Sequence, residues 1–241
     1  MEEKHKTVII TGASKGIGAS LVQAFLSRGY NVVANSLNDS NVELRTLPNC
    51  EFIRGDIGEK KTAEGIAESA ISRFGSIDHL VNNAGIFKAR RFTDYGVDEF
   101  RKFVSTNLEG FIFITQLAVK QMLSQASGGS VTTITAALAG NPIRGVPASI
   151  PMITKGGLNA ITLSLASEYA KENIRFNAVA PGVVDTPLHQ NDDKSILKAL
   201  NPMGVLPEAK DVTDAVIYLT EARYVTGEVL HVDGGAHVGK W

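Results

Sequence analysis

The feature that most constrains the fold of this chain is a regular alternation of short apolar runs with longer amphipathic segments. The runs are strand-sized and rich in β-branched residues, which predicts buried strands. The segments between them carry apolar residues at helical spacing, so we expect an α/β fold, a parallel sheet with helices on both faces. The predicted strands are 7–11, 31–35, 51–55, 78–83, 130–135, 174–180 and 228–232, and the predicted helices are 16–28, 60–74, 98–125, 152–171 and 211–220.

Length and composition allow these elements to share one core. The chain has 241 residues, of which 44% are hydrophobic, and single α/β domains reach this length. Neither a repeat nor a low-complexity linker interrupts it, so we predict one domain over residues 1–241. A polar stretch, 189–195, follows a Pro-rich turn and precedes a short helix. This pattern predicts a substrate flap at about 186–200.

The charge balance argues against nucleic acid and membranes as partners. The chain has 24 basic and 25 acidic residues, a formal charge of −1 and no basic run, so it offers no patch for a phosphate backbone or an anionic membrane. It shows no signal-peptide core and no apolar run of membrane-spanning length. The single cysteine, Cys50, cannot form an intramolecular disulfide. We expect a cytoplasmic protein that binds a small molecule, with no metal site.

A glycine-rich turn lies between the first predicted strand and the first predicted helix. Its three glycines allow a tight turn and a close approach of the backbone to a ligand, and the free N–H groups of the following helix favour a pyrophosphate. We therefore predict a dinucleotide site here. Its candidate residues are Gly12, Ser14, Lys15, Gly16, Ile17 and Gly18.

The Gly-x-x-x-Gly-x-Gly spacing of this turn, and segments along nearly the whole chain, resemble the short-chain dehydrogenase/reductase family. The matching segments are TGASKGIG (11–18), GDI (55–57), NNAG (82–85), STNLEG (105–110), the helix of Lys155, IRFNAVAPGVVDTP (174–187) and TGEVLHVDGG (226–235). The resemblance implies a Rossmann-type doubly wound sheet of seven strands. It also implies hydride transfer between a nicotinamide cofactor and a carbonyl or alcohol.

Carried over residue by residue, the resemblance places further cofactor contacts at the ends of the predicted strands. These are Asp56 and Ile57 for the adenine, Asn83, Ala84 and Gly85 for the inner ribose, Lys155 for the nicotinamide ribose, and Pro181, Gly182, Val184 and Thr186 for the nicotinamide side.

The end of the second predicted strand bears on the choice of cofactor. NAD-specific sites place a carboxylate there, which bonds the ribose 2′-hydroxyl and would repel a 2′-phosphate. In this chain the neutral Asn35 and Ser36 stand there, and Lys15 adds a cation in the glycine turn. We therefore predict that NADP(H) is preferred over NAD(H). Asp39, a few residues further on, argues in the other direction.

The catalytic positions match the family only in part. Reduction of a carbonyl leaves an alkoxide, so the site needs an acid, a hydrogen-bond donor and a cation. In the family these are a tyrosine, a serine and a lysine four residues after the tyrosine, and an asparagine completes a proton path. Asn107 and Lys155 match, but Pro151 stands at the tyrosine position and Ala137 at the serine position. Proline suits the first turn of a helix, so we expect the fold to tolerate it while the general acid is lost.

Three interpretations remain open. In the first, which we favour, the protein is an NADP(H)-dependent oxidoreductase in which Lys155 or His189, in the predicted flap, supplies the proton. In the second, it binds NADP(H) with little turnover and acts as a sensor or partner subunit. In the third, the reaction class has changed to elimination or isomerisation with Lys155 as the base.

The resemblance also implies self-association, as a homodimer that is often part of a homotetramer. We expect apolar side chains of the predicted helices 98–125 and 152–171 to contribute to such contacts, although some of them would instead pack in the core of one subunit. Trp241 could anchor the chain end on a neighbour. The helix residues are Phe100, Phe103, Ile112, Leu117, Leu163 and Leu165.

Overall fold

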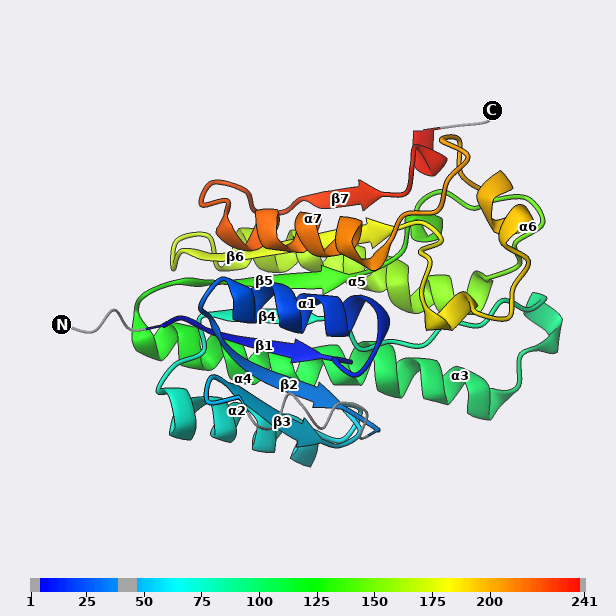
Figure 1. Cartoon of the computed structure of the whole chain (residues 1–241). Coiled ribbons are helices and arrows are strands. Elements are labelled where there is room, and N and C mark those ends of the chain that lie inside the picture. Colours follow the sequence, from blue (N-terminus) through cyan, green and yellow to red (C-terminus); the bar gives the residue numbers. More distant parts are fainter. Residues whose placement is uncertain (1–4, 39–46, 239–241) are drawn as a thin grey trace.

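Seven parallel strands form one sheet in the order β3-β2-β1-β4-β5-β6-β7 (Figure 1). The computed structural model describes residues 5–38 and 47–238. All seven predicted strands are found, with each end within one residue of its predicted place. They are β1 (Thr7–Thr11), β2 (Asn31–Ser36), β3 (Cys50–Arg54), β4 (His79–Asn82), β5 (Gly129–Ile134), β6 (Ile174–Pro181) and β7 (Val229–Val232).

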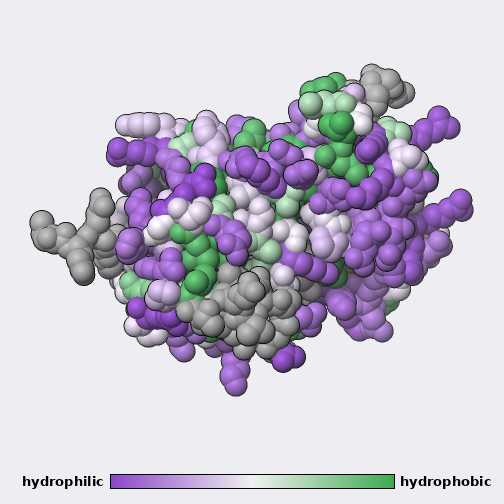
Figure 2. All heavy atoms as spheres, in the orientation of Figure 1, coloured by the Kyte–Doolittle hydropathy of each residue, from purple (hydrophilic) through white to green (hydrophobic). Residues whose placement is uncertain are grey.

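Helices cover both faces of this sheet, as the alternation predicts. The long helices are α1 (Gly16–Ser27), α2 (Lys60–Phe74), α4 (Gly110–Gln125), α5 (Ser149–Glu168) and α7 (Ala209–Glu221). In Figure 1, α1 and α7 lie in front of the strands, and α2, α4 and α5 lie behind them. The front face is mainly hydrophilic (Figure 2). No helix within the described ranges is both long and apolar enough to cross a membrane.

Side chains of the strands divide the core into two layers. On β1, Val8 and Ile10 pack in the cluster formed with α1 and α7, whereas Ile9 packs with α2 and α4 on the opposite face. All three are fully buried, because a strand with helices on both faces has no solvent side. This explains why the strand sequences are apolar at consecutive positions.

The predicted helix 98–125 is not one regular helix. It consists of α3 (Val97–Phe103), a π-helical segment η3 (Val104–Glu109) and α4. A π segment leaves the helix nearly continuous while it shifts the side chains around the axis, and such segments often occur at functional sites. Asn107 lies in this segment. The apolar spacing of the sequence gives no sign of the irregularity.

The helix that carries Lys155 begins three residues earlier than predicted and ends three residues earlier. It runs from Ser149 to Glu168, so Pro151 lies in its first turn. The missing N–H of Pro151 therefore costs no intrahelical hydrogen bond. This is a position in a helix that suits proline, as expected.

A buried histidine should make the fold sensitive to acid. His79 on β4 is 6% exposed, and its Nδ1 lies 2.9 Å from the Ser130 hydroxyl. Burial lowers the pKa of His79 from 6.5 to about 3. Between these two values the unfolded chain binds a proton that the folded chain does not, so stability falls as pH drops below about 6.5.

We expect His79→Gln to remove this sensitivity. From pH 7.5 to 5.0, the wild-type protein should lose about 2 kcal/mol more unfolding free energy than the variant, at about 1.4 kcal/mol per pH unit. Urea unfolding of both proteins at the two pH values measures the difference. Equal losses in the two proteins would show that His79 does not cause acid sensitivity.

Candidate active site

The carboxyl ends of the strands meet at one edge of the sheet, and the glycine turn lies there after β1. Gly12 has φ +66°, a conformation that favours glycine. A Cβ atom on Gly12 would lie 2.8 Å from the Cα of Ala84, and one on Gly18 would lie 2.1 Å from the carbonyl oxygen of Gly12. The turn is therefore packed against the loop after β4 and has no room for side chains at these positions.

Polar contacts hold the turn in this shape. The Asn83 amide donates to the carbonyl oxygens of Thr11 and Gly12, at 2.9 and 3.0 Å. The Thr11 hydroxyl accepts from the backbone N–H groups of Asn83 and Ala84. Asn83 and Ala84 were predicted from the sequence, but the role of Thr11 was not. Thr11 immediately precedes Gly12 in the sequence, and this position could have indicated its role.

The predicted adenine residues lie after β3, as expected. The Asp56 carboxylate accepts from the backbone N–H of Gly58 at 2.9 Å, which fixes the turn that follows. Ile57 is buried, and a Cβ on Gly110 would lie 2.9 Å from its Cγ2. The close packing of Ile57 on the start of α4 places the turn against the helix behind the sheet.

Asn35 and Ser36, in the region predicted to select the cofactor, are the last two residues of β2. The Asn35 amide is buried and donates to the carbonyl oxygens of Ile53 and Gly55, so it links β2 to β3. Lys15 is exposed at the N-cap of α1. Asp39 lies outside the described residues.

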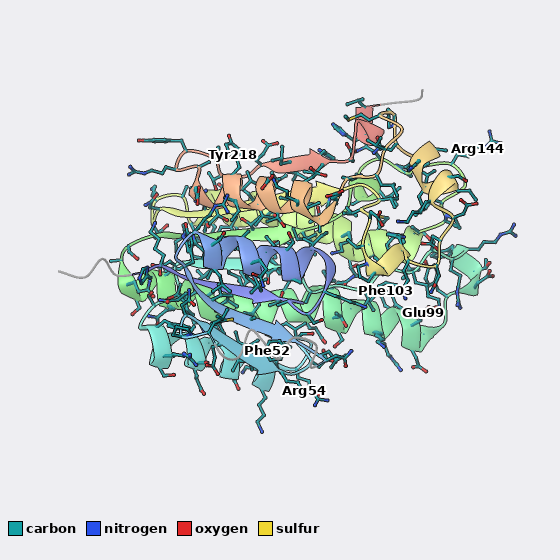
Figure 3. All side chains as sticks on the ribbon, in the orientation of Figure 1. Phe52, Arg54, Glu99, Phe103, Arg144 and Tyr218 are labelled. Carbon is teal, nitrogen blue, oxygen red and sulfur yellow. The ribbon has the colours of Figure 1, made fainter. Side chains whose placement is uncertain are left out.

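Arg54 adds a cation that was not predicted from the sequence. It is exposed at the end of β3, paired in register with Ser36 of β2 (Figure 3). Its Nε donates to the carbonyl oxygen of Leu37 at 3.4 Å. This hydrogen bond holds the guanidinium beside Leu37, the residue that follows the end of β2.

On the nicotinamide side, β6 ends at Pro181, and the Gly182 N–H donates to the Val232 carbonyl at 3.0 Å. Val184 is buried. The predicted flap begins next to the glycine turn, since a Cβ on Gly16 would lie 3.4 Å from the Cβ of Thr186. The predicted flap contains the short helices η5 (Pro187–His189) and α6 (Lys194–Ala199).

Lys155 is buried at the centre of this edge, with 7% of its surface exposed. Its Nζ donates to the Ile134 carbonyl at the end of β5, at 2.8 Å. A Cβ on Gly85 would lie 3.1 Å from the same nitrogen, so Lys155 also lies next to the loop after β4. Burial lowers the pKa of Lys155 from 10.5 to about 8. Its ammonium group is thus a stronger acid than that of an ordinary lysine.

Asn107 joins the loop after β4 to α5. Its Oδ1 accepts from the Ile86 N–H at 2.9 Å, and its Nδ2 donates to the Ile86 carbonyl at 3.2 Å and to the Thr154 hydroxyl at 3.0 Å. The structure therefore places Asn107 next to the loop that borders Lys155. Thr154 was not predicted from the sequence, because it precedes Lys155 in the chain without belonging to any recognised motif.

Neither Pro151 nor Ala137 has a hydroxyl group, and both side chains are buried. Tyrosines elsewhere do not replace the missing hydroxyl. Tyr169 lies at the opposite end of α5, where its ring packs on Phe176. The Tyr95 hydroxyl donates to the Lys88 carbonyl at 2.6 Å.

His189, the other predicted proton donor, lies in η5, within the predicted flap. Its Nδ1 is 2.7 Å from the Asp192 carboxylate. No hydrogen bond between His189 and Lys155 is found among the described residues. The same residues contain no group of three or more His, Cys, Asp and Glu side chains arranged to hold a metal ion.

Comparison with known proteins identifies this arrangement. A family profile described as "Enoyl-(Acyl carrier protein) reductase" matches residues 12–237. The 3alpha-hydroxysteroid dehydrogenase of Mediterraneibacter gnavus is 34% identical, with 97% of each chain covered. The chain belongs to the short-chain dehydrogenase/reductase family.

The relatives of this family member differ in substrate and cofactor. The L-rhamnose 1-dehydrogenase (NAD(P)(+)) of Sphingomonas sp. strain SKA58 is 31% identical, over 97% of this chain and 96% of that protein. A solved structure described as ElxO with NADP bound superposes with a TM-score of 0.88 at 28% identity, over 98% of this chain and 100% of the other. The chain is thus an oxidoreductase of short-chain dehydrogenase/reductase type, a family that binds nicotinamide cofactors and acts on small molecules.

The apolar residues expected at an oligomer interface divide into two groups. Phe103 is 1% exposed, so its side chain packs inside the subunit and is not available to a neighbouring one. Leu117 and Leu165 pack against the core. Phe100, Ile112 and Leu163 remain exposed, at 38%, 38% and 54%. Trp241 lies outside the described residues.

Proposed function

We propose that the protein is an NADP(H)-dependent carbonyl or alcohol oxidoreductase in which Lys155 supplies the proton that a tyrosine supplies elsewhere in the family. The observation that carries the proposal is the buried ammonium group of Lys155, which lies beside the glycine-containing loop after β4 and has no carboxylate partner among its described contacts. The cofactor would lie across the glycine turn, where a side chain at Gly12 or Gly18 would clash.

The residues of this chain divide the chemistry as follows. The bound nicotinamide supplies or accepts the hydride. Lys155 holds a proton on Nζ, and its lowered pKa favours donation to the alkoxide that forms when a carbonyl is reduced. Asn107 holds the neighbouring loop in place. His189, also proposed as a donor from the sequence, would have to approach from the flap and release Asp192.

The pH dependence of the reaction tests Lys155. We expect the rate of carbonyl reduction in single turnovers to fall above pH of about 8, because the ammonium group then loses its proton. Lys155→Met should remove this pH dependence together with most of the activity, at a cost of about 10² to 10⁴ in rate. His189→Ala is the matched comparison and should retain the wild-type profile. A profile that changes only in His189→Ala would assign the proton to His189.

Lys155 should also make stability depend on pH. The unfolding free energy should rise with pH over the range in which the rate of carbonyl reduction falls. Its pKa is lowered on folding, so the unfolded chain binds the extra proton between pH of about 8 and 10.5 and the unfolding free energy rises with pH in this window. Below it, the buried charge costs about 3 kcal/mol. We expect Lys155→Met to be more stable than the wild type at pH 7 in urea unfolding, and a less stable variant would contradict the proposed burial cost.

The preference for NADP(H) rests on charge at the ends of β2 and β3. Arg54 lies in register with Ser36, and Lys15 lies at the N-cap of α1 in the glycine turn. A 2′-phosphate bound at the end of β2 would form charge-assisted hydrogen bonds with such cations. Titration with NADPH and with NADH, followed by dihydronicotinamide fluorescence, tests the preference. NADPH should bind at least about tenfold more tightly. Arg54→Gln and Lys15→Ala should weaken binding of NADPH and leave that of NADH unchanged.

Turnover tests the catalytic part of the proposal. Bound NADPH should be oxidised by at least one member of a panel of aldehydes and ketones. If NADPH binds and none of them oxidises it, the protein is a cofactor-binding subunit without turnover. If neither NADPH nor NADH binds, the oxidoreductase proposal fails.

We further propose a cytoplasmic homodimer or homotetramer that contacts its neighbours through the exposed Phe100, Ile112 and Leu163. Such apolar side chains gain free energy when a second subunit covers them. Sedimentation of the wild type and of Leu163→Glu would test this, because the charge should shift the protein to a smaller species.

A further inference from the structure

A buried polar bridge connects α5 to the loop after β4, and Thr154 is at its α5 end. Thr154 is fully buried, with 0% exposed. Its hydroxyl donates to the Pro151 carbonyl at 2.8 Å and accepts from the Asn107 amide at 3.0 Å. Both functions of the hydroxyl are thus used, one within the first turns of α5 and one across to η3.

Asn107 transmits this contact to the loop that borders Lys155. Its amide forms two hydrogen bonds with the backbone of Ile86. Gly85 precedes Ile86, and a Cβ on Gly85 would lie 3.1 Å from Lys155 Nζ and 3.4 Å from Asn107 Oδ1. Gly85 therefore lies between the two side chains, and its position relative to the ammonium group depends on Asn107.

We propose that Thr154 is a positioning residue, whose hydroxyl holds Asn107, and through Asn107 the loop containing Gly85, against the ammonium group of Lys155. Thr154 does not itself transfer a proton, because it has no exposed surface and its own proton is directed at the Pro151 carbonyl. The inference rests on the proposed role of Lys155.

Loss of the hydroxyl would leave the Asn107 amide with an unsatisfied donor in a buried place, which is unfavourable. Asn107 also lines a small cavity, of about the size of one water molecule, together with Thr11, Asn82, Thr133 and Leu158. An Asn107 that turns toward this cavity would release the loop and admit water to Lys155. The low pKa of Lys155 is caused by burial, so access of water would raise it.

The test compares Thr154→Val, which keeps the shape and removes the hydroxyl, with Thr154→Ser, which keeps the hydroxyl. The pKa of Lys155 is measured without turnover, from the pH dependence of its acetylation by acetic anhydride and peptide mass spectrometry. We expect a midpoint near pH 8 for the wild type and for Thr154→Ser. For Thr154→Val the midpoint should rise by about one unit or more, and NADPH should bind about tenfold more weakly.

A folded Thr154→Val protein with the wild-type midpoint and NADPH affinity would overturn the proposal, and so would a Thr154→Ser protein that behaves like Thr154→Val. If Thr154→Val does not fold, the same measurements on Thr154→Cys decide, since a thiol is a poor substitute for the hydroxyl. Failure of the proposed function is separate. It would appear as a wild-type protein that oxidises no NADPH, whereas the acetylation midpoints still report on Thr154.

Discussion

Gly18→Ala is expected to abolish cofactor binding and to destabilise the fold. The added Cβ would lie 2.1 Å from the Gly12 carbonyl oxygen and 2.7 Å from the Asn83 amide nitrogen. The first contact is with backbone, so it cannot be relieved by rotating a side chain. To relieve this clash, α1 would have to move away from the turn. The movement would disrupt the backbone N–H groups to which we assign pyrophosphate binding. We expect a loss of about 3 kcal/mol in unfolding free energy and at least about 100-fold in NADPH affinity.

Gly65→Ala is the matched control for this substitution. Gly65 lies within α2, and a Cβ there would meet nothing within 4 Å. Alanine is the better helix former, so this variant should gain about 0.5 to 1 kcal/mol and bind NADPH normally. Urea unfolding and fluorescence titration of both variants provide the comparison. Normal NADPH binding by Gly18→Ala would refute the assignment of the glycine turn to the cofactor.

The double substitution Pro151→Tyr with Ala137→Ser is expected to increase the rate of carbonyl reduction. It introduces a phenol one helical turn before Lys155 and a hydroxyl at the first residue of η4 (Ala137–Ala139), the short helix that follows β5. The ammonium group of Lys155 would lower the pKa of the new phenol and so make it a better acid. A general acid contributes about 10² to 10⁴ in rate, and we expect a gain in this range for kcat with little change in NADPH affinity.

Pro151→Phe with Ala137→Ser separates the hydroxyl from the ring. Phenylalanine gives the same ring and the same change in the first turn of α5 without an acidic proton, so this variant should remain at the wild-type rate. Single-turnover oxidation of NADPH by the best carbonyl of the panel is the measurement. Equal rates for the tyrosine and phenylalanine variants would mean that proton transfer does not limit the reaction of this protein.

Local features of the sequence were sufficient for the strands, the glycine turn and the first turn of α5. Each strand is defined by its own run of β-branched residues, and Gly12 is needed by the turn in which it lies. The absence of hydroxyl groups at positions 137 and 151 also follows from the sequence alone, once the spacing from Lys155 is known. These features depend on residues that are neighbours in the chain, and the structure agrees with them.

The surroundings of the candidate catalytic group were decided by the tertiary structure. Asn107 and Thr154 are 47 residues apart in the chain, and only the π-helical segment η3 and the packing of α5 bring their side chains together. In the same way, the contacts between β2 and β3 turn the Asn35 amide into the sheet, although its position in the sequence suggested a cofactor contact. The sequence shows that residue 155 is a lysine and can carry a charge. Its lowered pKa comes from burial, which requires several segments of the chain to pack around it.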